Sequence, residues 1–350
     1  MTIVYILLAI TIIAIATPFI LAYAFPHKVN SNEVLISIGC SVVITLISLG
    51  IVFSDLHNTE LLHGQVTGKE RQTVSCEHSY SCNCRTTTNS QGHSTTECDT
   101  CYEHSNDYDW VVKSTVGSIE IKRIDEQGKK EPPRFTSVQK GDPVAVESWY
   151  IDYVSASSKS LFNLSQHSTN PVNVKYPSVY DYYNTNLVIN QSSVSKEVVQ
   201  QMNSELRMHL RTLAAKKQSN IIVVLTNKDR SFANDIQYAW NNGRKNDQVV
   251  VIGVGDANNI VWAYAFGWSK NQMVNIAIRD ELQEMGTFNG TEVINTITKN
   301  VEKHFNRTPM AEYKYLLSDV EVPTWAIIFI MLLQIGGNIG IAFFIVKNRS

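Results

Sequence analysis

The chain has 350 residues, which is enough for two modest domains and additional segments. Its formal net charge is −2, with 30 Lys and Arg against 32 Asp and Glu, so it lacks the basic excess that nucleic-acid binding requires. The apolar residues are concentrated towards the two ends of the chain, and the long region between them is polar.

Three apolar runs without charged residues occupy residues 3–24, 34–53 and 325–346. The hydrocarbon core of a bilayer is about 30 Å thick, so a helix of roughly 20 residues crosses it. The first run ends in a small-residue pattern like that of a signal-peptide cleavage site, but no Lys or Arg precedes it and it exceeds the usual length of a signal core. We therefore predict an integral membrane protein with three transmembrane helices in contact with the lipid bilayer.

The cations beside these runs predict an orientation. Lys28 lies between the first two runs, and Lys347 and Arg349 follow the third. Because Lys and Arg favour the cytoplasmic side of a membrane, the central region is placed on the extracytoplasmic side. The predicted localisation is a multi-pass protein of an inner or plasma membrane.

The third run contains Gly336 and Gly340, which are four residues apart and would lie on one face of a helix. Such a pair lets a second helix approach closely, and Asn338 between them could hydrogen-bond across the contact. The predicted partners are other membrane proteins or a second copy of the chain. The alternative is that both glycines are simply tolerated in a membrane helix.

Residues 56–106 form a Cys/His-rich segment with little aliphatic content, so a metal or cross-links would be needed to order it. Cys82 and Cys84 form one closely spaced pair, and Cys98 and Cys101 form another. Two such pairs can direct four thiolates to one tetrahedral zinc ion. Additional or replacement ligands are Cys76, His78 and His104.

Disulfides are the competing interpretation of the same cysteines, because thiols outside the cytoplasm oxidise. Five cysteines would give two disulfides and one remaining thiol. Bonds within each short pair would be strained, which favours bonds between the pairs or with Cys76. The odd count and the histidines favour a metal, whereas the compartment favours disulfides. A redox-active role for Cys98 and Cys101 lacks a following helix that would activate the thiol.

Two further regions follow, and their sequence patterns differ. Residues 107–165 contain short β-like runs separated by Gly and Pro, which predicts a small, mostly β module. Residues 176–307 alternate between helical periodicity and short aliphatic runs, which predicts an α/β sandwich around a central sheet. The predicted helices are 193–217, 232–240, 273–285 and 293–305, and the predicted strands are 221–225, 249–254 and 260–266.

Local sequences in this α/β region carry a family resemblance. They are Val179-Tyr180-Asp181-Tyr182 before Leu187, the strand 221–225, Phe232-Ala233-Asn234-Asp235 with Trp240, Arg244-Lys245-Asn246-Asp247 before the strand 249–252, and residues 260–267. In this order they resemble the TPM domain, a membrane-associated α/β domain of bacteria and plastids. The block from Cys98 to Trp110 is also similar to segments of uncharacterised membrane proteins of large bacteriophages.

The TPM resemblance implies an extracytoplasmic domain beside membrane helices, with phosphatase activity and divalent-cation binding proposed for some members and roles in assembly for others. By position, Asp181 and Asp247 correspond to acidic residues of the family's candidate site. From chemistry alone, each acid is also typical of a solvated turn. The sequence contains no nucleophile–base pair or phosphate-binding loop that would support hydrolysis independently.

We therefore expect an envelope protein whose central region serves protein interaction, scaffolding or assembly without catalysis. The first alternative is an ectoenzyme, a metal-dependent phosphohydrolase that uses Asp181 and Asp247. The second is a phage-encoded membrane protein that acts on the host envelope. A channel or transporter is disfavoured, because the three apolar runs contain no ionisable residue.

Overall fold

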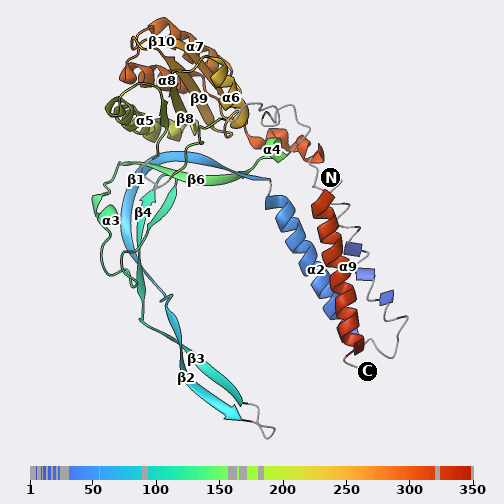
Figure 1. The fold of residues 1–350 in the computed structure, drawn as a ribbon. Helices are drawn as coiled ribbons and strands as arrows, with labels where there is room; N and C mark the ends of the chain where they lie inside the picture. Colours follow the sequence, from blue (N-terminus) through green and yellow to red (C-terminus); the bar gives the residue numbers. More distant parts are fainter. Residues whose placement is uncertain are drawn as a thin grey trace.

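A computed structural model of the chain describes residues 31–54, 56–88, 94–156, 172–179, 185–319 and 324–347, with Leu164 and single positions between 5 and 23. Figure 1 shows three parts: a pair of long helices, a bent antiparallel sheet that extends into a thin two-stranded arm, and an α/β unit. The long strand β1 (His57–Val74) connects the helix pair to the base of the arm.

The helix pair consists of α2 (Ser31–Ser54) and α9 (Thr324–Lys347), which lie side by side. Buried polar groups join them, because the Gln334 side-chain amide donates to Thr45 Oγ1 at 2.8 Å and to the Ser41 carbonyl at 3.2 Å. Gly337 approaches α2, and a Cβ atom there would lie 3.7 Å from Ile44.

The predicted membrane spans are contradicted by this structure. In the part of the chain that is described, no helix combines the length and the apolar character needed to cross a membrane. This finding overturns the spans at 34–53 and 325–346 and the multi-pass membrane localisation. The runs are helical, but part of each packs against the other around buried Ser41 and Gln334. Most of the first predicted span, 3–24, lies outside the described residues.

The antiparallel sheet has the strand order β5-β4-β1-β6. The other strands are β4 (Asp107–Ser114), β5 (Gly117–Ile121) and β6 (Pro143–Ile151). The first half of β1 pairs with β6, and the second half pairs with β4. Where β1 changes partner, Gly64 is required, because a Cβ atom there would collide with the Thr115 hydroxyl. Trp110 packs edge-on against Phe135 of the short helix α3 (Pro133–Ser137) beneath this sheet.

The arm is a hairpin of β2 (Ser79–Thr88) and β3 (Ser94–Tyr102), which pair antiparallel. Figure 1 shows it projecting from the sheet, away from the α/β unit. Nearly all of its described residues are exposed. The arm thus has no core of its own, as expected for the segment 56–106. The sequence did not predict β1, which lies in the same segment and is the longest strand of the sheet.

The α/β unit contains a sheet of order β10-β9-β8-β7. β7 (Val188–Gln191), β8 (Asn220–Thr226) and β9 (Asp247–Val254) are parallel, and β10 (Ile260–Gly267) is antiparallel to β9. Every residue of β8 and β9 is buried, as their aliphatic sequences predict. The accompanying helices are α5 (Lys196–Lys217), α6 (Ser231–Ala239), α7 (Met273–Met285) and α8 (Gly290–His304). The short α4 (Tyr153–Ala156) contacts the 3-10 segment η2 (Met310–Asp319).

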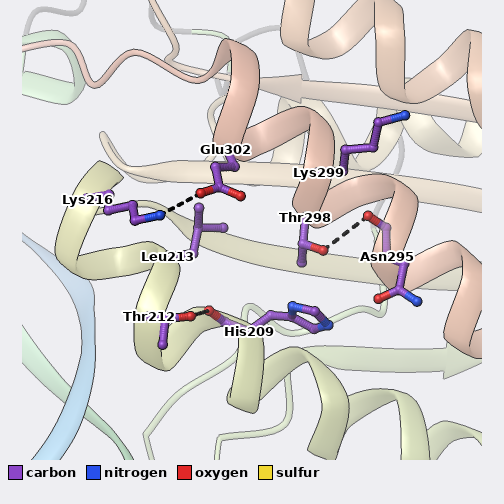
Figure 2. Close-up of a pocket in the computed structure, with 8 residues that line it drawn as sticks. All are labelled: His209, Thr212, Leu213, Lys216, Asn295, Thr298, Lys299 and Glu302. Carbon is purple, nitrogen blue, oxygen red and sulfur yellow. Dashed lines mark hydrogen bonds and ion pairs between the residues drawn. The ribbon is translucent and has the colours of Figure 1, made fainter.

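The helices α5 and α8 pack together and enclose a shallow polar hollow of about 350 Å³. Figure 2 shows Lys216 on α5 reaching across to Glu302 on α8, with 2.8 Å between the ammonium nitrogen and the carboxylate oxygen. Thr298 turns its hydroxyl back to the carbonyl of Ile294 in its own helix. Lys216 and Glu302 thus join the two helices through an exposed ion pair, whereas the Thr298 hydroxyl bonds within α8.

A buried polar junction joins β1 to the α/β unit. The His63 ring on β1 lies 2.8 Å from the Asn220 side-chain oxygen, measured from Nε2. The Asn220 amide donates to Asp247 at 2.8 Å, so its oxygen is left to accept and His63 Nε2 carries the hydrogen. Burial lowers the pKa of His63 to about 4, although the hydrogen bond to Asn220 acts in the opposite direction. His63 is therefore neutral at pH 7.

This shift predicts acid sensitivity. In the unfolded chain His63 has a pKa of about 6.5, so as pH falls the unfolded state takes up a proton before the folded state does. The free energy of unfolding therefore has its full value above pH 6.5. It decreases as the pH falls towards 4, by about 3 kcal/mol in total. Urea unfolding at a series of pH values measures this loss. The His63→Gln variant should show a flatter profile, and an equal slope in both proteins would contradict the assignment.

Candidate metal centre

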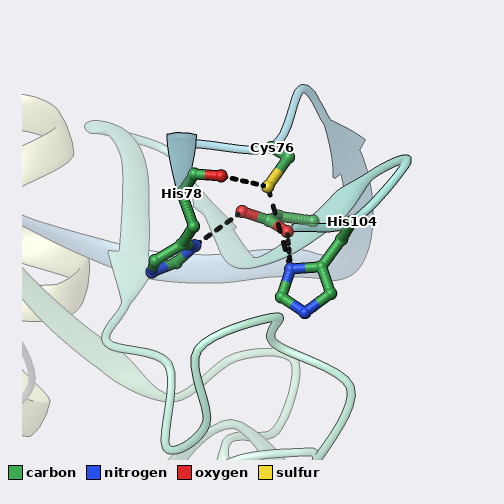
Figure 3. Close-up of side chains that lie close together, drawn as sticks. Cys76, His78 and His104 are labelled. Atoms are coloured by element: carbon green, nitrogen blue, oxygen red, sulfur yellow. Dashed lines mark hydrogen bonds and ion pairs between the residues drawn. The ribbon is translucent and has the colours of Figure 1, made fainter. Parts of the chain in front are cut away.

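Four potential metal ligands meet where the arm leaves the sheet. Cys76 and His78 lie between the end of β1 and the start of β2. His104 follows β3, and Asp107 is the first residue of β4. The two chain segments that enter and leave the arm therefore contribute two residues each. Figure 3 shows the Cys76, His78 and His104 side chains directed towards a common point.

Three separations between ligand atoms are close to those of a tetrahedral zinc site. One ligand atom from each of the four residues lies within 4.8 Å of the others. Cys76 Sγ is 3.7 Å from His104 Nδ1, and His104 Nδ1 is 3.4 Å from one carboxylate oxygen of Asp107. His78 Nδ1 lies 3.5 Å from the other oxygen of Asp107. Zinc bonds of about 2.0–2.3 Å place neighbouring tetrahedral ligands roughly 3.3–3.8 Å apart.

Burial gives a second reason to place a cation here. Cys76 and Asp107 are buried, whereas the side chains of His78 and His104 are 35% and 26% exposed. His78 Nδ1 and Asp107 Oδ1 are buried, and neither has a hydrogen-bond partner among the described residues. Their nearest polar neighbours belong to the same cluster, Asp107 Oδ2 at 3.5 Å from His78 Nδ1 and His104 Nδ1 at 3.4 Å from Asp107 Oδ1. A cation among them would give both buried atoms a direct bond.

The Asp107 oxygen that lies near His78, Oδ2, also has partners on its other side. It accepts the Glu77 backbone N–H at 3.1 Å and lies 3.3 Å from a guanidinium nitrogen of Arg123. Arg123 is itself fixed by Asp109, to which its Nε donates at 2.8 Å. Burial alone would raise the pKa of Asp107, but the Glu77 N–H, the Arg123 charge and the Cys76 thiol outweigh it and lower the pKa. The carboxylate is therefore ionised, as a ligand must be.

The centre is accessible from one side. His78 borders an open cleft of about 490 Å³ that is also lined by Glu77, Glu120, Lys122 and Arg123. Of the four ligands, His78 is the one that lines this cleft, so it is the side of the centre that an ion in the cleft would meet first.

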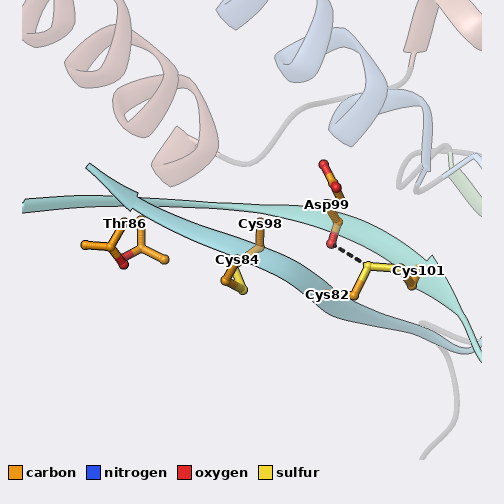
Figure 4. The surroundings of a disulfide bond; sticks show 7 residues. Cys82, Cys84, Thr86, Cys98, Asp99 and Cys101 are labelled. Carbon is orange, nitrogen blue, oxygen red and sulfur yellow. Dashed lines mark hydrogen bonds between the residues drawn. A yellow bond between two sulfur atoms is a disulfide. The ribbon is translucent and has the colours of Figure 1, made fainter.

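The four cysteines of the arm are paired with one another. Cys82 bonds to Cys101 and Cys84 bonds to Cys98, as Figure 4 shows. Both disulfides connect β2 to β3, which is the cross-pairing alternative predicted from the sequence. The zinc site predicted at these four cysteines is not present, because sulfurs bonded to each other are not available as thiolates. Asn83 adopts a φ of 48° inside a bulge of β2, which adjusts the register between the two bonds.

The sequence named three of the four residues of this candidate centre. Cys76, His78 and His104 were expected as additional or replacement ligands, and the structure brings them together. Asp107 was missed, because it was read as the first residue of the following β module. A Cys-x-His pattern before the hairpin and a His-x-x-Asp pattern after it are the signal that could have identified the set. Cys40 lies in α2 and is not part of this centre.

The acids expected from the TPM resemblance lie elsewhere. Asp181 lies outside the described residues. Asp247 is fully buried and accepts hydrogen bonds from the Tyr176 hydroxyl at 2.7 Å, the Arg244 backbone N–H at 2.7 Å and the Asn220 amide. Burial raises its pKa against these hydrogen bonds. The geometry gives Asp247 a place in the buried junction with β1, and a catalytic role for either acid stays a prediction.

No family model, curated protein or solved structure matches this chain. The resemblances to the TPM domain and to phage proteins therefore stay predictions. The two disulfides and a Cys/His/Asp group able to hold a metal ion are what the structure itself provides.

Proposed function

We propose that this chain is an interaction or scaffolding protein that presents the β2–β3 arm, and that a structural zinc ion at Cys76, His78, His104 and Asp107 fixes the arm to the sheet. One observation carries the proposal: ligands from both ends of the arm converge, and two of their buried atoms have no hydrogen-bond partner among the described residues.

The ligand chemistry supports zinc over other common cations. A thiolate and two imidazoles suit Zn²⁺, whereas Mg²⁺ and Ca²⁺ prefer oxygen ligands. Four protein ligands fill a tetrahedral shell, which is typical of structural sites, whereas catalytic zinc sites keep one position open. The chemistry of the site thus favours a supporting role over hydrolysis.

The arm has the properties of a displayed surface. Its two strands have no hydrophobic core, and a two-stranded ribbon of this kind is marginal in water without support. The two disulfides hold β2 to β3 along the arm, and the metal would hold the pair to the sheet at its base. This reinforcement stabilises an exposed shape that buries little of its own surface, which suits a binding role.

Zinc content tests the proposal. The purified chain, dialysed against trace zinc, should retain about one equivalent, and Co²⁺ in its place should give a tetrahedral spectrum with a thiolate charge-transfer band. Cys76→Ser should abolish that band, and His104→Ala and Asp107→Asn should weaken zinc binding by on the order of 100-fold or more. Asp99→Asn, which changes an exposed acid of the arm, is the matched control and should bind as the wild type does. Equal binding by wild type and His104→Ala would refute the centre.

A further inference from the structure

Five cysteines lie in or beside the arm, and only four are in disulfides. Cys76, the fifth, stays a thiol although it lies closer along the chain to Cys82 and Cys84 than their native partners do. Resting on the zinc site proposed above, we infer that zinc protects Cys76 during oxidative folding and directs the other four cysteines into their native pairs.

In the unfolded chain, loop-closure entropy favours a non-native disulfide between Cys76 and Cys82. The native disulfides join cysteines that are 19 and 14 residues apart, whereas Cys76 precedes Cys82 by only six residues. The probability of loop closure falls as the three-halves power of loop length, so the loop from Cys76 to Cys82 closes roughly sixfold more readily than the native loop from Cys82 to Cys101. An unprotected Cys76 is therefore the strongest competitor for Cys82.

Binding of Cys76 to zinc also reduces the number of possible disulfide pairings. Five cysteines can form two disulfides in fifteen ways, since each of five can be left out and the other four have three pairings. If zinc holds Cys76, only the three pairings of the remaining four are left. The ion thus removes most of the incorrect products before any disulfide forms.

The same ion sets the register of the arm. Zinc binds His78 directly before β2 and His104 directly after β3, so it brings the two ends of the hairpin together. The backbone N–H of Glu103 then donates to the His78 carbonyl at 3.1 Å, and the ladder continues with Ser79 opposite Tyr102. In this register Cys82 lies opposite Asp99, two residues from Cys101, and Cys84 and Cys98 lie where the register shifts at the bulge. The Cα atoms of the two cysteine pairs are 5.8 Å and 4.0 Å apart in the folded hairpin, so a hairpin closed in this register holds each pair within reach of bonding.

Zinc also prevents later exchange. A free Cys76 thiolate can attack the Cys82 sulfur, so that the bond between Cys76 and Cys82 forms while the bond between Cys82 and Cys101 breaks. Cys101 leaves as a thiolate and takes up a proton, and no net oxidation occurs. Coordination to zinc draws negative charge from the Cys76 sulfur and fixes its position, which lowers its reactivity towards the Cys82 sulfur.

The test is refolding of the reduced full chain in a glutathione buffer, with either zinc or a chelator present. Acid quenching and mass spectrometry then identify the disulfides. Cys40 is replaced by serine in all samples, so that it cannot contribute. With zinc we expect the two native pairs and a reduced Cys76. With chelator we expect the native product to fall severalfold and Cys76 to enter disulfides.

Two variants separate protection from general folding defects. Cys76→Ser removes the competitor, so in chelator it should give a higher yield of the native pairs than the wild type does. His104→Ala keeps the competitor but disrupts the site, so it should mispair under both conditions. The inference fails if the wild type pairs correctly in chelator, or if Cys76→Ser in chelator pairs no better than the wild type.

Zinc titration of the oxidised native chain distinguishes this failure from failure of the proposed function. Tight zinc binding together with zinc-independent pairing would overturn only the folding role. Absence of zinc binding would overturn both.

Discussion

Zinc is expected to slow amide hydrogen exchange at the base of the arm by about three orders of magnitude. At a free zinc concentration 1,000 times the dissociation constant, binding stabilises the closed state by about 4 kcal/mol. Opening the base separates His78 from His104 and destroys the site, so exchange that requires this opening slows by the same factor. The hydrogen bonds concerned include Glu103 N–H to the His78 carbonyl and Glu77 N–H to Asp107.

The effect should be local. Strands β8 and β9 are fully buried in the α/β unit, and their amides should exchange at the same rate with and without zinc. His104→Ala should show no zinc effect at the base of the arm. Protection that spread equally over the arm and the α/β unit would indicate a global effect of zinc, which contradicts a structural site at Cys76 and Asp107.

Much of the α/β unit could be predicted from its sequence. The aliphatic runs at 221–225 and 249–254 are strands buried on both faces, and such strands need no alternation of polar residues. The helix predicted at 193–217 corresponds to α5, whose buried residues Met202, Leu206 and Leu210 recur at helical spacing. Local sequence patterns are enough to predict these elements, because the apolar residues that each one contributes to the core recur within its own sequence.

Strand β1 shows where local pattern fails. It contains few aliphatic residues, and its burial comes from partners distant in sequence. Leu61 joins the core of the α/β unit, whereas Val66 joins the core beneath β4. Because the two halves of one strand serve different cores, no single periodicity marks it. The prediction of membrane spans at 34–53 and 325–346 was wrong for a different reason. The composition of each run does not reveal that α2 packs against α9.

Recognising the candidate metal site also required three-dimensional information. The spacing of Cys82, Cys84, Cys98 and Cys101 is compatible with either zinc or disulfides, and pairing cannot be deduced from spacing alone. Only the folded hairpin shows that Cys82 meets Cys101 and that Cys84 meets Cys98. The same register leaves Cys76 outside the arm, where it meets His104 and Asp107.

Glu60→Ala is expected to lower the free energy of unfolding by about 3 kcal/mol. The Glu60 side chain on β1 is 4% exposed and lies between two cations of the α/β unit. Both of its oxygens accept from Arg307 at 2.6 Å, and Lys245 lies 3.0 Å away. Removing one partner of a buried ion pair costs about 3–5 kcal/mol, because the remaining charge is left without compensation. Arg307 and Lys245 keep some solvent contact, which places the expected value at the lower end.

Glu302→Ala is the matched control, because it removes the same carboxylate from an ion pair of similar length. Lys216 and Glu302 are 2.8 Å apart, but their side chains are 67% and 54% exposed, so water replaces the lost interaction (Figure 2). Denaturant unfolding of both variants therefore compares a buried carboxylate with an exposed one at equal change in net charge. Glu60→Gln, which keeps the side-chain volume, should resemble Glu60→Ala if charge is the cause. Equal stability of the Glu60 and Glu302 variants would show that β1 is held to the α/β unit by its apolar contacts and by the His63 and Asn220 hydrogen bond instead.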